Sequence, residues 1–265
     1  METAVTELFS VAGKTALVTG GSRGIGLMIT RGLVAAGARV YISSRKAAVG
    51  EEVAAELSKV GFCVSIPADL AEPEEAERLA SQVMQREPSL EIMVNNAGAV
   101  WAAPLGQFPA SAWDKVLDVN LRAVFLLTQA LVPALVAGAR PGDPARVINI
   151  GSVDGMRAPG SMPWDAETYS YSTSKAAVHH LTLLLAKRLG PRGITVNAIA
   201  PGPFDTRMLA STLAAHRDAI IAASPLGRIG EPDDIVGTVL FLSSRAGAYV
   251  NGAVIPLDGG MVATR

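Results

Sequence analysis

The sequence contains very little cysteine and histidine. Its 265 residues include one cysteine, Cys63, and three histidines. A single thiol excludes an internal disulfide and any metal site built from several cysteines. His179 and His180 are adjacent, but no acidic or cysteine residue stands at ligand spacing from them, so packing is favoured over metal binding. We therefore predict no metal site.

An excess of charge and a long apolar run are also missing. Lys and Arg total 23 against 24 Asp and Glu, for a net charge of −1, which argues against nucleic acid or an anionic membrane as a partner. Charged, Gly or Pro residues interrupt every apolar stretch before it can span a bilayer. The N-terminus is acidic and lacks the basic start of a signal peptide. We expect a cytoplasmic protein that does not bind membranes.

Short apolar runs alternate with segments of helical periodicity. Strands are predicted at 15–20, 39–44, 63–68, 90–95, 146–151, 195–200 and 253–257, and helices at 24–36, 47–60, from 72, about 111–136, 168–189 and 232–243. Because the strands are apolar throughout, helices must cover both faces of a parallel sheet. We predict one α/β domain, residues 1–265, with a doubly wound, seven-stranded sheet and a helical insertion at about 205–223.

A glycine-rich turn follows the first predicted strand. The run Thr19-Gly-Gly-Ser-Arg-Gly-Ile-Gly26 lies where this strand passes into the first helix. Glycines permit a tight turn and let backbone amides and the helix N-terminus approach a pyrophosphate. A purely structural turn is the alternative. The residues predicted to bind a dinucleotide are Gly20, Ser22, Arg23, Gly24, Ile25 and Gly26.

The end of the second strand indicates the form of the dinucleotide. NAD sites usually carry an acidic residue there, whereas this chain has Ser44-Arg45-Lys46. Arg45 and Arg23 could pair a 2′-phosphate through bidentate hydrogen bonds. We therefore predict NADP(H), with Ser44 and Arg45 at the site. The alternative is that Arg45 and Lys46 are solvated residues that open the next helix.

Polar and small residues close the third and fourth strands. Asp69, followed by Leu70, could accept a hydrogen bond from adenine or cap a helix, and the two roles are compatible. Asn96, Ala97 and Gly98 combine a polar side chain with small residues where the backbone must approach the ribose. Asparagines can also merely satisfy a turn.

Tyr171 and Lys175 stand four residues apart in a predicted helix, which places the phenol and the ammonium on one face. Alone, such a pair is usually a solvated tyrosine and lysine. Here it accompanies the glycine turn and Ser152, which ends an apolar strand. Ketone reduction needs a proton donor at the developing alkoxide. The combination therefore indicates a carbonyl-reducing enzyme.

Together these motifs resemble the classical short-chain dehydrogenase/reductase family over nearly the whole chain. The matching motifs are Thr19-Gly-x-x-x-Gly-x-Gly26, Asp69-Leu70, Asn95-Asn-Ala-Gly98, Asn120 in Asp-Val-Asn-Leu, Ser152, Tyr171-x-x-x-Lys175 and Pro201-Gly202. The resemblance implies a Rossmann fold. Within the family the chain is most similar to 3-oxoacyl-thioester reductases, including those of rhamnolipid synthesis, in the segments Arg146-Val-Ile-Asn-Ile-Gly-Ser152 and Val254-Ile-Pro-Leu-Asp-Gly-Gly260.

The resemblance also implies a role for each catalytic residue. Ser152 would orient the substrate oxygen, and Tyr171 would donate the proton after its pKa falls by about three units from about 10. Lys175 and an oxidised nicotinamide would supply the positive charge for this fall, and Lys175 would also hold the ribose. Asn120 would distort its helix and anchor a proton-relaying water, or simply be a buried, satisfied amide. The predicted carboxamide contacts are Pro201, Gly202 and Thr206.

For substrate and assembly, the resemblance implies a mobile lid at 205–223 and a homotetramer packed through the two long helices and the C-terminal strand near Gly259 and Gly260. The preferred substrate is a 3-oxoacyl thioester, carried by acyl-carrier protein or CoA. A sugar, polyol or hydrophobic ketone is the enzymatic alternative. A nicotinamide-binding regulator that senses redox state is the non-enzymatic one.

Two features depart from the family pattern. Ser152 and Tyr171 are 19 residues apart, which is longer than usual, and the intervening segment 157–167, with Trp164, is expected to rim the substrate pocket. Tyr169 has Thr173, not lysine, four residues later. We therefore expect Tyr169 to pack or to line the pocket.

Overall fold

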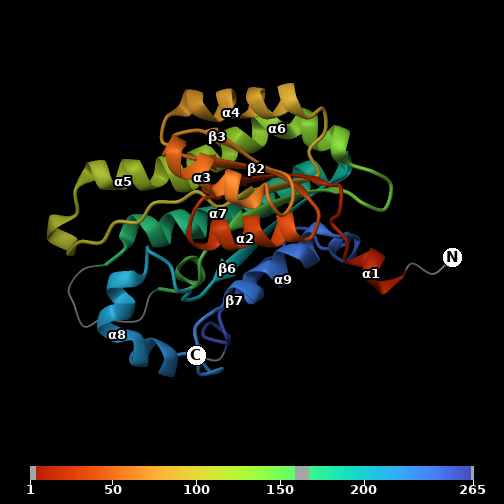
Figure 1. Ribbon diagram of the computed structural model, residues 1–265. Coiled ribbons are helices and arrows are strands. Elements are labelled where there is room, and N and C mark those ends of the chain that lie inside the picture. Colours follow the sequence, from red (N-terminus) through yellow and green to blue (C-terminus); the bar gives the residue numbers. More distant parts are fainter. Residues whose placement is uncertain (1–3, 159–166, 264–265) are drawn as a thin grey trace.

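The computed structural model describes residues 4–158 and 167–263. Its seven parallel strands have the order β3-β2-β1-β4-β5-β6-β7 (Figure 1). The strands are β1 (Thr15–Thr19), β2 (Arg39–Ser44), β3 (Cys63–Pro67), β4 (Ile92–Asn95), β5 (Ala145–Ile150), β6 (Ile194–Pro201) and β7 (Val254–Leu257). The doubly wound, seven-stranded sheet predicted from the sequence is confirmed.

Helices cover both faces of this sheet. Those described are α1 (Val5–Leu8), α2 (Gly24–Ala35), α3 (Ala47–Leu57), α4 (Pro73–Arg86), α5 (Ala110–Leu117), α6 (Ala123–Gly138), α7 (Tyr169–Leu189), α8 (Ala210–Ala222) and α9 (Pro232–Ser243). Side chains of α4, α6 and α7 pack on one face, and those of α2, α3 and α9 on the other (Figure 1). A continuous apolar strand therefore fills two cores at once.

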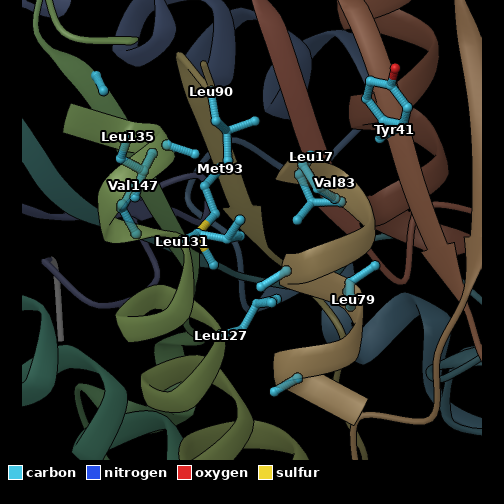
Figure 2. Close-up of a cluster of buried hydrophobic side chains, with 14 of the residues drawn as sticks. Leu17, Tyr41, Leu79, Val83, Leu90, Met93, Leu127, Leu131, Leu135 and Val147 are labelled. Carbon is cyan, nitrogen blue, oxygen red and sulfur yellow. The ribbon is translucent and has the colours of Figure 1, made fainter. Parts of the chain in front are cut away.

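The alternation of strand side chains separates these two cores. Leu17 and Met93 point to the α4 and α6 side, as Figure 2 shows, where they meet Leu131. Their neighbours Val18 and Val94 point to the α2 and α9 side. Because the chain order reverses between β1 and β4, a crevice forms beyond the carboxyl ends of these strands, where such sheets bind ligands.

The long helical segment predicted at about 111–136 is interrupted. A five-residue π-helical turn, Asp118–Arg122, joins α5 to α6.

Contrary to our expectation that every apolar stretch is broken, the helix Ala110–Gly138, taken with this turn, is long and apolar enough to cross a membrane. Buried core helices meet the same criteria, and the side chains of Leu127, Leu131 and Leu135 are fully buried in the core (Figure 2).

The helical insertion predicted at about 205–223 begins later than expected. Helix α8 starts at Ala210 and bends at His216, whose φ of −141° and ψ of 23° are not helical. Phe204 explains the delay, because it is 2% exposed and forms a parallel bridge with Gly230. The chain is thus anchored in the core before it can turn into a helix.

Candidate active site

The π-helical turn holds Asn120 inside the protein. Its side chain is 1% exposed and accepts a hydrogen bond from the Ala99 amide at 2.8 Å. Its Nδ2 donates to the Ala99 carbonyl at 3.0 Å and to Ser174 Oγ at 2.9 Å. Asn120 is thus a buried, satisfied amide that fixes the loop after β4 against α7, and its role in a water relay stays a prediction.

Lys175 is buried between the ends of β4 and β5. Its Nζ donates to the Ile150 carbonyl at 2.7 Å, and the residue is 5% exposed. A Cβ placed on Gly98 would lie 3.9 Å from Nζ, so the loop after β4 comes very near the ammonium. No carboxylate of the described residues pairs with it. Burial consequently lowers the pKa of Lys175 to about 8.

Tyr171 lies one helical turn from Lys175, with the Lys175 Nζ 5.6 Å from the centre of its ring. Burial of the phenol raises the pKa of Tyr171 to about 12, against the effect of its hydrogen bond with Ser152, and the charge of Asp154 adds to the increase. In the protein on its own, desolvation thus outweighs the hydrogen bond. The fall in this pKa was predicted with an oxidised nicotinamide bound, and it stays a prediction.

Ser152 begins a short 3₁₀ turn, Val153–Gly155, and its Oγ accepts a hydrogen bond from the Asp154 amide at 3.1 Å. This turn is tight against α7, since a Cβ on Gly155 would lie 2.6 Å from the backbone carbon of Lys175. His179 fills the space beside it, and a Cβ on Gly151 would lie 2.1 Å from its Nε2. The contacts agree with the packing role expected for His179 and hold Ser152 beside Tyr171.

The glycine turn after β1 has the backbone that its sequence predicts. Gly20 and Gly24 adopt φ values of 63° and 53°, which favour glycine. A Cβ on Gly26 would lie 2.3 Å from the Gly20 carbonyl oxygen, so the turn closes tightly. Helix α2 starts at Gly24 without a side-chain cap. Its first amides are therefore available to an anion.

Thr19 joins this turn to the loop after β4. Its Oγ1 accepts hydrogen bonds from the amides of Asn96, at 2.9 Å, and Ala97, at 3.0 Å. In return Asn96 Nδ2 donates to the Thr19 carbonyl at 2.9 Å. The Thr19 side chain was not among the predicted site residues. The available signal was a hydroxyl at the end of an apolar strand that precedes glycines.

The residues after β2 and β3 differ in their partners. Ser22 donates to Ser44 at 3.0 Å, which ties the glycine turn to the end of β2. Arg23 and Arg45 are exposed, and neither guanidinium pairs with a described residue. Asp69 accepts from the Ala71 amide at 3.2 Å within the loop before α4, whose N-cap is Glu72, so the capping alternative is wrong. Its contact with adenine stays a prediction, as does that of the buried Leu70 next to it.

The end of β6 approaches the glycine turn from the opposite side. A Cβ on Gly24 would lie 3.6 Å from the Thr206 side chain. Pro201 ends β6, and Gly202 packs against Asp258, which a Cβ would meet at 2.9 Å. The structure thus brings most of the predicted site residues to one edge of the sheet. A cavity of about 760 Å³ on the outer side of α2 and α9 contains none of the four predicted catalytic residues.

Comparison with known proteins agrees with this arrangement. The family described as enoyl-(acyl carrier protein) reductase matches residues 20–262. The rhamnolipids biosynthesis 3-oxoacyl-[acyl-carrier-protein] reductase of Pseudomonas aeruginosa is 47% identical over 95% of this chain and 97% of its own. The gluconate 5-dehydrogenase of Gluconobacter oxydans is 34% identical over 96% of this chain and 97% of its own.

A solved structure from Pseudomonas aeruginosa, RhlG in an active-site complex with NADP, superposes with a TM-score of 0.91. It is 46% identical, and the match covers 97% of this chain and 99% of that one. The chain belongs to the short-chain dehydrogenase/reductase family. This member of the family carries the four predicted catalytic residues in the order Asn120, Ser152, Tyr171 and Lys175. The fold brings these four residues together.

Two exposed apolar residues follow, in the sequence, the segments that carry the predicted catalytic residues. Trp101 is 43% exposed and follows the loop that Asn120 holds, and Met156, 38% exposed, follows the Ser152 turn. Tyr169 packs edge-on against Phe108, with ring centres 5.8 Å apart, as the packing role predicted for it requires. Of the predicted rim, residues 159–166 with Trp164 lie outside the described residues. Glu167, at its end, pairs with Ala103 through two backbone hydrogen bonds.

Proposed function

We propose that the protein is an NADP(H)-dependent reductase that converts a ketone into a secondary alcohol, with a 3-oxoacyl thioester as its substrate. One observation carries the proposal: Ser152, Tyr171 and Lys175 meet at the carboxyl edge of the sheet, next to the glycine turn. The named reductase relatives support the same chemistry. A redox-sensing regulator would not need this set of residues.

Each residue of the set has a task that follows from its surroundings. Ser152 donates a hydrogen bond to the substrate oxygen, and Tyr171 gives that oxygen its proton. The raised pKa of Tyr171, about 12, keeps the phenol protonated at neutral pH. Lys175 places a positive charge beside the phenol, which favours its ionised form as the proton leaves. The nicotinamide of NADPH, when bound, supplies the hydride.

The residues around the glycine turn fit NADP(H). Gly20 and Gly26 leave a backbone surface without side chains, which suits a pyrophosphate. The two unpaired cations, Arg23 and Arg45, suit a 2′-phosphate. The pyrophosphate contacts proposed are Gly20, Ser22, Arg23, Gly24, Ile25 and Gly26; Ser44 and Arg45 hold the 2′-phosphate, Asp69 and Leu70 the adenine, and Asn96, Ala97, Gly98, Tyr171 and Lys175 the ribose, with Pro201, Gly202 and Thr206 at the carboxamide.

The cofactor assignment is tested by replacing Arg45 with Asp. A charge-assisted hydrogen bond is lost and a repulsion is added, so the dissociation constant for NADPH should rise by about 30-fold or more, while that for NADH should stay nearly constant. Lys59→Asp, the same charge change at an exposed site, is the matched control. Equal effects of Arg45→Asp on both cofactors contradict the assignment.

Two substrate classes are tested together. The exposed apolar residues Trp101 and Met156 favour an acyl chain, whereas the gluconate 5-dehydrogenase relative supports a sugar ketone as the second candidate. The experiment follows NADPH oxidation with a short 3-oxoacyl thioester and with 5-ketogluconate. Turnover of the thioester that falls by at least about 10²-fold in Tyr171→Phe supports the proposal. Turnover of the sugar alone favours the second candidate.

We also propose a homotetramer, a lid and a cytoplasmic location. Exposed apolar residues support self-association, namely Trp113, Phe125, Leu183 and Leu184 on α5, α6 and α7, and Tyr249 before β7. Segment 205–223 is the proposed lid. Leu213 is the buried residue among the described residues of α8, so few core contacts would hold this helix in place. The single, buried thiol of Cys63 supports the cytoplasm. Light scattering tests the tetramer, limited proteolysis with and without NADPH tests the lid, and cell fractionation tests the location.

A further inference from the structure

Asp154 occupies a fixed position beside the reacting groups, yet the mechanism above does not use it. It lies in the turn Val153–Gly155, where its amide donates to Ser152 Oγ at 3.1 Å. The next residue, Gly155, touches the backbone of Lys175 so closely that a Cβ would lie 2.6 Å away. The turn is therefore packed directly against α7. It places Asp154 two residues after Ser152 and beside the helix that carries Tyr171 and Lys175.

The carboxylate itself has no partner to neutralise it. Asp154 is half-buried, and no described residue forms an ion pair or donates a hydrogen bond to its side chain. A partly desolvated carboxylate without a partner is costly. Val153, the residue before it, is apolar, 8% exposed and part of the core, and Gly155 has no side chain. Asp154 is therefore the residue that gives this turn a polar side chain.

Two charged residues act on the pKa of Asp154. Arg157 lowers this pKa, and Glu167 raises it. The charge of Asp154 also raises the pKa of the Tyr171 phenol. Of the described residues, Asp154 therefore adjoins both groups of the proposed oxygen site, Ser152 through its amide and Tyr171 through its charge.

We propose that Asp154 is a specificity-determining residue, which excludes 3-keto acids, whose carboxylate is one methylene away from the reacting carbonyl, and so favours neutral 3-oxo esters and thioesters. The inference rests on the proposed function, since it concerns the substrate of the same site. Two like charges in a partly desolvated cleft repel each other, and such repulsion is a common source of specificity. A 3-oxoacyl thioester carries no charge at this position.

The test uses two substrates that share one ketone, acetoacetate and methyl acetoacetate, with NADPH at pH 7.5. The first carries the negative charge and the second does not. In Asp154→Asn the ratio of kcat/KM for the ester to kcat/KM for the acid should fall by about tenfold or more, through a gain with acetoacetate. Any effect of Asp154 on the acidity of Tyr171 cancels in this ratio, because both substrates receive their proton from that phenol.

Glu167→Gln is the matched control, because it removes a nearby carboxylate that does not act on Tyr171. Its ratio should change by less than about threefold. Thermal unfolding followed by circular dichroism shows whether Asp154→Asn still folds, and the isosteric amide keeps the backbone bond to Ser152. A ratio that stays the same in folded Asp154→Asn overturns the proposal, as does an equal loss with both substrates.

The outcome also separates this inference from the proposed function. If the wild-type protein reduces neither ketone, the proposed function fails for this substrate class. The comparison is then made on binding, by calorimetric titration of acetoacetate and of its methyl ester into the NADPH-loaded protein. Tighter binding of the acid in Asp154→Asn, with the ester unchanged, still supports charge exclusion. Equal affinities in both proteins overturn it.

Discussion

Strand β5 has a buried cation at each end, and the two cations differ in the number and charge of their hydrogen-bond partners. Arg146, at its start, is 1% exposed and binds Asp143 at 2.9 Å and the carbonyls of Leu242 and Ser244 at 2.9 and 2.8 Å. Lys175, at its end, is 5% exposed and has a single carbonyl. A buried charge with a counterion supports the fold, whereas one without it remains free for chemistry.

The amino edge of the sheet holds a network of hydrogen bonds around Arg146, although its Nη1 is buried without a partner. Lys14 reaches the same carboxylate of Asp143 at 2.8 Å and the Ser243 carbonyl at 3.0 Å. These carbonyls belong to the C-terminal end of α9, where the helix dipole favours a cation. At the carboxyl edge no carboxylate of the described residues pairs with Lys175. The comparison predicts that stability depends on the first edge and catalysis on the second.

The largest effect is expected for Lys175→Met. We expect kcat/KM for ketone reduction to fall by about 10³-fold, because the phenol loses the adjacent positive charge. The free energy of unfolding should stay the same or increase, since an unpaired buried charge is replaced by an apolar chain of similar length. Steady-state kinetics and urea unfolding measure the two. A variant that is markedly less stable would break the comparison.

Arg146→Met should give the reverse result. Its loss leaves Asp143 with Lys14 alone and takes the side-chain donor from the Leu242 carbonyl, so unfolding should become easier by about 4 kcal/mol. The value of kcat/KM should change by less than about twofold in the fraction that remains folded. Arg31→Met is the control, because the pair Arg31–Glu56 is exposed and should contribute about 0.5 kcal/mol or less. A large loss of activity with unchanged stability would contradict this prediction.

The pH dependence of stability separates the two cations further. The pKa of Lys175 is about 8 in the folded protein against 10.5 for the free side chain. Between these values the unfolded chain holds a proton that the folded one has released, so stability rises with pH. Relative to Lys175→Met, the wild type should gain on the order of 3 kcal/mol across this window. Tyr171 and Cys63, with pKa values raised to about 12 and 11, act oppositely in both proteins and largely cancel.

Denaturant unfolding at pH 7.5, 8.5 and 9.5 measures this difference. A wild-type protein that gains no stability relative to Lys175→Met over this range would show that Lys175 stays charged in the fold. The ammonium would then have an additional partner, and the distinction between the two ends of β5 would disappear.

Local patterns were enough to predict much of this molecule. The four-residue spacing of Tyr171 and Lys175 places both on one face of a helix whatever the rest of the chain does. The apolar strands predicted a covered, parallel sheet, because their composition reflects burial on both faces. The glycines from Gly20 to Gly26 predicted a tight turn for the same local reason.

Features that depend on distant partners could not be predicted in this way. The π-helical turn at Asn120 is held by Ala99 and Ser174, far away in the sequence. The raised pKa of Tyr171 results from burial that no spacing reveals. Asn149 is a polar residue between Ile148 and Ile150 of β5, and the sequence does not show what satisfies its side chain.

The structure answers this last point with a buried chain of hydrogen bonds. Asn95 Nδ2 donates to Asn149 Oδ1 at 2.9 Å, and Asn149 Nδ2 donates to Thr182 Oγ1 at 2.9 Å. Thr182 in turn donates to the Val178 carbonyl at 2.8 Å. This chain links β4 and β5 to α7 behind the catalytic residues, so it belongs to the scaffold rather than to the reaction.

Thr182→Val should therefore have the smallest effect and fall on stability. It leaves Asn149 Nδ2 buried without an acceptor, which should cost about 2 kcal/mol, with kcat nearly unchanged. Thr238→Val is the matched control, because Thr238 also donates to a carbonyl four residues earlier, that of Asp234 at 2.9 Å, but accepts nothing from another side chain. It should cost less than about 0.5 kcal/mol. Equal costs would show that the helix bond, and not the partner on β5, makes the Thr182 hydroxyl important.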